Sequence, residues 1–154
     1  AIRVSTPQLE LTTYLSEPML APGNRFAVML SVEPLDGMHV YAPGAADYRV
    51  IGLELNDQPW IQQLPVQYPE STPYYFEPFD ETVPVYEEPF EIVQELILEG
   101  TLEAQQAMRG QESITIRGTL GYQACSETIC YPPQEIPLSW TVPLRPLVFG
   151  PPRR

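Results

Sequence analysis

Proline is the residue that most constrains this fold, because 19 prolines are spread through a chain of only 154 residues. Proline has no backbone N–H, so within sheets it is confined to edge strands, bulges and strand ends. The prolines and 9 glycines lie between short segments in which apolar residues alternate with polar ones. Short alternating segments joined by frequent turns are typical of two packed sheets. We therefore predict an all-β fold, a two-sheet β-sandwich.

Eight segments carry the pattern expected of strands. They are residues 4–11, 25–33, 38–41, 48–55, 64–68, 90–98, 113–120 and 136–142. Residues 25–33 are apolar on both faces, as a central strand would be, and residues 4–11 are interrupted by a proline, as an edge strand would be. Residues 90–98 fit a strand or a short helix, and their β-branched centre favours the strand. Residues 100–110 have good helix propensity but too little length to require a helix.

The stretch 69–89 differs from the rest because it combines five prolines with five aromatic residues. That is too much proline for a central strand and too much aromatic surface for a solvated linker. We predict a long ordered loop that lies over the surface of the domain, where functional residues are often found.

Apolar residues make up 44% of the chain and charged residues 18%, which is a globular composition. We predict one domain over residues 1–146 and a tail or linker over residues 147–154. The chain has no apolar run long enough to span a membrane, and its first residues lack the long apolar run of a signal peptide.

Acidic residues outnumber basic ones by 20 to 8, which gives a net charge of −12. A surface of this charge repels polyanions, so we expect neither nucleic acid nor an anionic lipid surface as a partner.

Cys125 and Cys130 are the two cysteines of the chain, and they lie between the predicted strands 113–120 and 136–142. In the chain-entropy model a disulfide that closes about six residues stabilises by roughly 2 kcal/mol, and one that closes about fifty by roughly 4 kcal/mol. A short-loop disulfide therefore adds little stability, and beside a turn it stays open to attack by a thiolate. The spacing favours a redox pair over a structural staple without excluding the staple. A metal site is disfavoured, because two cysteines with no histidine nearby do not complete a tetrahedral shell.

The sequence Tyr122-Gln-Ala-Cys125, followed by Cys130-Tyr-Pro-Pro133, resembles the redox motif of the N-terminal domain of the thiol:disulfide interchange protein DsbD family. Weaker similarities at residues 37–43, 85–86 and 90–92 extend the resemblance over most of the chain. The resemblance implies an immunoglobulin-like sandwich in the periplasm that works without a cofactor. It also implies electron transfer from a thioredoxin-like donor domain to periplasmic thioredoxin-fold acceptors, with a link to cytochrome c maturation. The chain would then be part of a longer membrane protein.

The resemblance also assigns roles to single residues. Cys130 corresponds to the cysteine that forms the mixed disulfide with partners, and Cys125 to the cysteine that resolves it. The stretch 69–89 falls where the family has a flexible cap over the cysteines, and Phe79 is the candidate for the aromatic residue that shields them. Tyr41 and His39 fall where the family places aromatic residues beside the site.

Tyr122 and Tyr131 flank the two cysteines, where they serve either as a docking surface for partners or as sheet packing. Glu127 lies between the cysteines, and the nearest basic residues in sequence, Arg117 and Arg145, are outside the motif. Because negative surroundings disfavour a thiolate, we expect the reduced thiols to rest mostly protonated.

Two other functions stay open at this point. One is a binding module without enzymatic activity, in which the aromatic stretch grips a protein or a glycan and the disulfide is structural. The other is a copper-handling module that uses both cysteines, His39 and methionines such as Met38, and the scattered methionines make it the weakest of the three.

Overall fold

A computed structural model describes residues 1–145, and within them it has twelve strands, one α-helix and one short 3-10 helix. The strands are β1 (Ile2–Ser5), β2 (Leu9–Leu15), β3 (Arg25–Pro34), β4 (His39–Tyr41), β5 (Gly52–Leu55), β6 (Ile61–Gln67), β7 (Thr72–Phe76), β8 (Glu81–Tyr86), β9 (Phe90–Leu98), β10 (Ser113–Tyr122), β11 (Ala124–Cys125) and β12 (Gln134–Pro143). The helices are α1 (Leu102–Met108) and η1 (Glu77–Phe79). The predicted tail over residues 147–154 lies outside the described residues.

The larger sheet has the order β1-β2-β3-β9-β6, and all its neighbouring strands are antiparallel. β3 lies in its middle, which confirms the prediction of a central strand. β1 is an edge strand, as predicted. The predicted strand over residues 4–11 is interrupted at Pro7, between β1 and β2, also as predicted. At the other edge, β6 has a register shift between Gln63 and Val66, where Pro65 interrupts the ladder.

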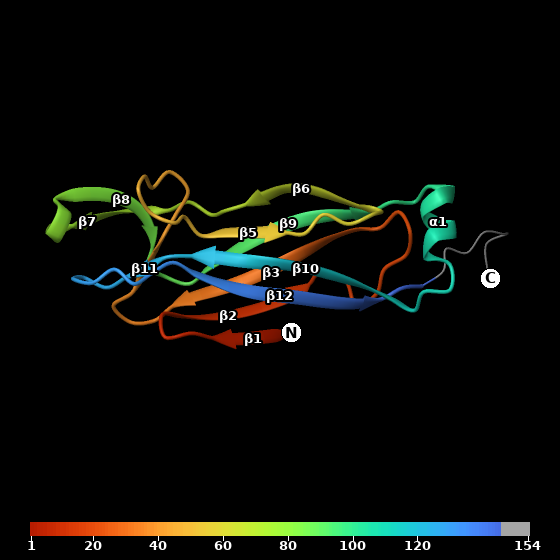
Figure 1. Cartoon of the computed structure of the whole chain (residues 1–154), viewed down its shortest axis with the longest axis horizontal. Coiled ribbons are helices and arrows are strands. Elements are labelled where there is room, and N and C mark those ends of the chain that lie inside the picture. Colours follow the sequence, from red (N-terminus) through yellow and green to blue (C-terminus); the bar gives the residue numbers. More distant parts are fainter. Residues whose placement is uncertain (146–154) are drawn as a thin grey trace.

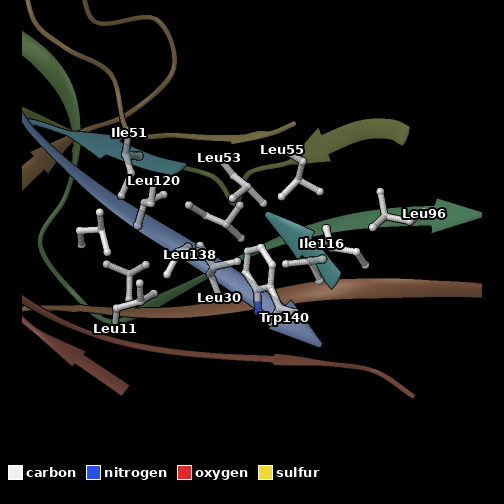
Figure 2. Close-up of a cluster of buried hydrophobic side chains, with 14 of the residues drawn as sticks. Leu11, Leu30, Ile51, Leu53, Leu55, Leu96, Ile116, Leu120, Leu138 and Trp140 are labelled. Atoms are coloured by element: carbon white, nitrogen blue, oxygen red, sulfur yellow. The ribbon is translucent and has the colours of Figure 1, made fainter. Parts of the chain in front are cut away.

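A second sheet, of order β12-β10-β5, packs against the first and closes the core. Figure 2 shows the apolar side chains of the two sheets pointing into one layer, with Leu11 and Leu30 on one side and Leu120 and Leu138 on the other. Trp140 lies in the same layer and is buried, and its indole N–H donates a hydrogen bond to Oγ1 of Thr13 at 3.0 Å. The structure is therefore the predicted all-β sandwich, with an immunoglobulin-like arrangement of two packed sheets.

A third sheet, of order β11-β4-β8-β7, extends from one end of the sandwich. Figure 1 shows β7, β8 and β11 at this end and α1 at the opposite end. Because β11 follows β10 after a single residue, the strand that crosses the core also leads directly into the cysteine motif.

The prediction of a long ordered loop over residues 69–89 was wrong, because most of this stretch forms the hairpin β7–β8. Its prolines fit a ladder because Pro73 and Pro84 are paired with each other. In an antiparallel ladder every second residue pair makes no backbone hydrogen bonds. Two prolines that face each other at such a pair therefore remove no hydrogen bond between β7 and β8. Strand β4 also stabilises the hairpin, because it pairs with the edge of β8 that faces away from β7.

Residues 100–110, which the sequence left undecided, do form helix α1. Thr101 caps its first turn by accepting a hydrogen bond from the backbone N–H of Ala104 at 3.1 Å. The strand predicted over residues 48–55 is shorter than expected and begins only at Gly52. Among the described residues, no helix is long and apolar enough to cross a membrane.

Candidate functional site

The two cysteines form a disulfide that bridges two facing segments of a tight turn. Cys125 and Cys130 are antiparallel partners, with their Cα atoms 4.0 Å apart. Backbone hydrogen bonds lie on both sides of the pair, from Ser126 N–H to the carbonyl of Ile129 at 2.8 Å and from Tyr131 N–H to the carbonyl of Ala124 at 3.0 Å. The cysteines thus occupy a non-hydrogen-bonded pair, where side chains on the same face lie closest together.

Ser126 fixes the four-residue turn between the cysteines. Its Oγ accepts hydrogen bonds from the backbone N–H of Thr128 at 3.3 Å and of Ile129 at 3.1 Å. A serine that bonds to the backbone two and three residues ahead stabilises a turn in place of regular structure. This role of Ser126 was not predicted from the sequence, where a serine at the first position of a short turn was the available signal.

The two sulfur-bearing residues differ in exposure. Cys125 is fully buried, whereas Cys130 is only partly buried. The small apolar cluster around them is formed mainly by Tyr41 from β4 and by Val83 and Val85 from β8. A partner that approaches from solvent therefore meets Cys130 first.

Tyr41 places its hydroxyl group beside the disulfide, nearer to Cys125 than to Cys130. The hydroxyl donates a hydrogen bond to Sγ of Cys125 at 3.0 Å and lies 3.8 Å from Sγ of Cys130. Burial raises the pKa of Tyr41 to about 12, so the hydroxyl keeps its proton at neutral pH and remains a donor. The ring stacks on Tyr48 with the centroids 3.9 Å apart, and the Tyr48 hydroxyl in turn donates to the Glu81 carboxylate. This stack holds the Tyr41 hydroxyl in place.

His39 lies beside Cys125 on the neighbouring strand, because it is the β4 partner of Cys125 in the ladder between β4 and β11. The side chain is 1% exposed, and its ring lies 4.1 Å from the ring of Tyr74, centroid to centroid. Burial lowers the pKa of His39 to about 4, so the imidazole is neutral at physiological pH. Within residues 1–145 its Nε2 atom has no hydrogen-bond partner.

The structure brings Cys125, Cys130, Tyr41 and His39 together, but it does not bring Phe79 to them. Phe79 lies in η1 at the tip of the hairpin β7–β8, is 62% exposed, and packs on Phe76 with the ring centroids 5.2 Å apart.

The two tyrosines of the motif differ in burial. Tyr122 is buried in the main core, where its hydroxyl donates to Oγ1 of Thr6 and Oε1 of Gln8, each at 3.0 Å. A docking role for Tyr122 does not fit this burial, and sheet packing, the other expected role, does. Tyr131 is partly exposed next to Cys130, so its docking role stays a prediction.

A known family spans most of this chain. The family described as the N-terminal domain of the thiol:disulfide interchange protein DsbD matches residues 12–138. The chain belongs to this family. Comparison with curated proteins gives no match.

A solved structure has the same fold as this DsbD-family domain. It is the N-terminal periplasmic domain of ScsB from Proteus mirabilis, with a TM-score of 0.54 and 10% sequence identity. The similarity covers 92% of this chain and 49% of that chain, so the present chain spans about half the length of its structural relative. At this identity the similarity shows the fold alone.

The family and the site agree at the level of reaction class. The DsbD family is one of thiol:disulfide interchange, and this member carries its two cysteines bonded to each other at the end of a sandwich. Among the described residues, no three histidine, cysteine or acidic side chains come together as a set of metal ligands.

Proposed function

We propose that this chain is a periplasmic protein-disulfide reductase domain. Its Cys125–Cys130 pair would relay two electrons from a thioredoxin-like donor domain to thioredoxin-fold acceptors, including acceptors that serve cytochrome c maturation. The observation that supports this best is the asymmetry of the disulfide. Cys130 is accessible, whereas Cys125 is buried with the Tyr41 hydroxyl 3.0 Å from its sulfur.

The first step loads the domain with electrons. A thiolate of the donor attacks Sγ of Cys130, the bond between Cys125 and Cys130 breaks, and a disulfide forms between the donor and Cys130. Cys125 leaves as a thiolate, which accepts the Tyr41 hydrogen bond and then takes up a proton. The donor's second thiolate attacks its own half of the mixed disulfide and releases Cys130, which is protonated in turn. The donor dithiol is thereby oxidised, and both cysteines are reduced.

The second step passes the same two electrons on. The Cys130 thiolate attacks the disulfide of an acceptor and forms a second mixed disulfide. Cys125 then loses its proton and attacks Cys130, which restores the Cys125–Cys130 bond and releases the acceptor as a dithiol. A hydrogen bond donor fixed beside Cys125 stabilises the thiolate in both directions, because it favours the charged form of the sulfur.

The hairpin β7–β8 would shield the disulfide from unspecific thiols until a partner displaces it. Val83 and Val85 of β8 belong to the same small buried cluster as Cys125. Phe79 would act through Phe76, which is 2% exposed and lies beside the His39 ring, with the ring centroids 6.4 Å apart. Phe79 thus anchors the tip of the shield rather than touching the sulfur atoms.

A docking surface for partners would surround Cys130. Tyr131 is partly exposed beside it, and Ile129 is 55% exposed in the turn between the cysteines. The periplasmic location is part of this proposal, and a bonded cysteine pair supports it, because an oxidising compartment maintains such a bond.

Trapping experiments with single cysteine variants test the proposal. Cys125→Ala leaves Cys130 free to attack but removes the resolving thiol, so we expect it to accumulate a mixed disulfide with an oxidised thioredoxin-fold protein. Cys130→Ala is the matched control, and it should trap little because the remaining sulfur is buried. Equal absence of adducts with both variants, together with resistance of the wild-type disulfide to reduction, would instead identify a structural disulfide in a binding module.

A further inference from the structure

We propose that an acidic groove beside the disulfide binds a basic side chain, an arginine or lysine, of the protein that exchanges thiols with Cys130. This inference rests on the proposed function, because it names the chemistry of the partner surface at the same site. The acidic groove is defined by five carboxylates and His39, which lie around a cavity of about 400 Å³. The carboxylates belong to Glu33, Asp36, Glu87, Glu88 and Glu127.

The acidic groove is contiguous with the disulfide. Glu127 belongs to the turn between the two cysteines, and His39 is the ladder partner of Cys125. Tyr74 also lines the groove, and the charges of Glu127 and Glu87 contribute to raising its pKa, after burial. Both carboxylates therefore act on the same ring, although they come from different segments of the chain. A partner that reaches Cys130 would lie over this groove.

No ion pair in the described part of the chain neutralises the charge of the acidic groove. Among residues 1–145 the ion pairs are Arg25–Glu95 and Arg49–Glu135, and neither includes a groove residue. The five carboxylates are all exposed and make no side-chain hydrogen bonds in the described structure. A surface of this sign around a concave site attracts cations and repels anions.

His39 supplies an independent sign of a missing ligand. It is 1% exposed, it lines the groove, and its Nε2 has no partner among the described residues. Buried polar atoms are nearly always hydrogen-bonded, so a buried orphan atom calls for an explanation. A neutral imidazole has one nitrogen that accepts a hydrogen bond, and a guanidinium or ammonium group can donate it. The positive charge of either group also attracts the carboxylates of the groove.

The size of the groove fits this occupant. A cavity of about 400 Å³ is at the small end of the range of ligand pockets, about 300–1,000 Å³. It suits one or two long side chains of a docked protein rather than a large cofactor. The carboxylates lie around the rim, where charges chiefly raise the association rate and discriminate between partners.

Nuclear magnetic resonance with a peptide that cannot exchange thiols tests this inference apart from the redox function. His39 is the only histidine of the chain, so its ring protons report on the groove without overlap. The probe is acetyl-Gly-Arg-Ser-Arg-Gly-amide, and acetyl-Gly-Gln-Ser-Gln-Gly-amide is its neutral control. We expect the arginine peptide to shift the His39 resonances in a saturable, salt-sensitive manner, and the glutamine peptide to leave them unchanged.

Two double variants with the same net charge distinguish the effect of the groove carboxylates on peptide binding from the effect of the net charge of the domain. Glu87→Gln with Glu88→Gln removes two groove carboxylates, whereas Glu103→Gln with Glu112→Gln removes two exposed carboxylates near the α1 end. We expect the groove variant to bind the arginine peptide about fivefold more weakly, and the distant variant to change by less than about twofold. Equal weakening in both variants, or no shift of His39, would overturn the groove inference. Reduction of the disulfide by a thioredoxin-fold donor, measured in the same samples, shows separately whether the exchange function holds.

Discussion

Tyr41 is the side chain that makes the two sulfur atoms chemically different. Its hydroxyl lies 3.0 Å from Sγ of Cys125, the buried sulfur, and 3.8 Å from Sγ of Cys130. We predict that Tyr41→Phe slows reduction of the disulfide by a thioredoxin-fold donor by about tenfold or more, because a hydrogen bond to a charged group contributes about 1.5–3 kcal/mol. Stopped-flow kinetics measures the rate.

Tyr86→Phe is the matched control for Tyr41→Phe. It also removes a tyrosine hydroxyl, but that hydroxyl donates to the carbonyl of Pro69 rather than to sulfur. The control should keep the wild-type rate. If Tyr41→Phe also kept it, the hydroxyl would have no part in stabilising the Cys125 thiolate.

His39 should make the stability of the domain depend on pH. Burial lowers its pKa to about 4 from an ordinary value of 6.5, so the unfolded chain takes up this proton at a higher pH than the folded chain does. The contribution of the neutral imidazole is therefore complete above about pH 6.5 and is lost as the pH falls towards 4. We predict a loss of about 2–3 kcal/mol of unfolding free energy across this range.

Urea denaturation at several pH values measures this loss, and His39→Phe serves as its control. The variant keeps an aromatic ring at the buried position but has no titrating group. Its stability should fall less between pH 6.5 and 4 than that of the wild type, with only the carboxylates contributing. Identical pH profiles for the two proteins would show that His39 is not buried in its neutral form.

At the residue scale, the sequence alone identified the cysteines and little else of the site. Cys125 and Cys130 stand out because they are close in sequence. Tyr41 reaches Cys125 across 84 positions, and only the ladder between β4 and β11 brings His39 to the disulfide. Contacts at such sequence distances leave no local pattern, so both residues were accessible only through the family resemblance.

At the scale of elements, the hairpin β7–β8 is the part that the sequence misjudged. The sequence of its strands predicted a loop, because proline normally disfavours a position within a β-ladder. The pairing of Pro73 with Pro84 can be recognised only once the register of the two strands is known. The strands of the two packed sheets were predicted correctly in most cases, because alternation of apolar residues is itself the local sign of a strand with one buried face.

The hairpin should control access of small thiols to the disulfide. We predict that Phe79→Ala accelerates reduction by dithiothreitol, because loss of the contact with Phe76 loosens the tip of the shield. Val83→Ala should accelerate it more, since Val83 belongs to the small buried cluster that contains Cys125, whereas Phe79 does not. Leu102→Ala, which removes an exposed apolar side chain from α1 at the other end of the molecule, should have no effect. Unchanged rates in both hairpin variants would rule out a shielding role.

At the scale of the whole molecule, the sandwich should not depend on its disulfide. The main core lies between the two large sheets, whereas Cys125 and Cys130 belong to the separate small cluster. We predict that the reduced protein keeps the circular dichroism spectrum of the oxidised protein. Its unfolding free energy in urea should be lower by only about 2 kcal/mol, the chain-entropy contribution of so short a loop. Unfolding upon reduction would instead mark the bond as a structural staple.

The reduction potential of Cys125–Cys130 distinguishes a working redox pair from a structural disulfide. Equilibration of the whole chain with glutathione redox buffers, followed by trapping of free thiols, measures the potential. Structural disulfides of secreted proteins lie below about −300 mV, and disulfides that exchange with thioredoxin-fold proteins lie well above this value. We predict a potential in the upper range, at which the pair titrates in glutathione buffers. A bond that stays oxidised in the most reducing of these buffers would instead show that the disulfide is structural.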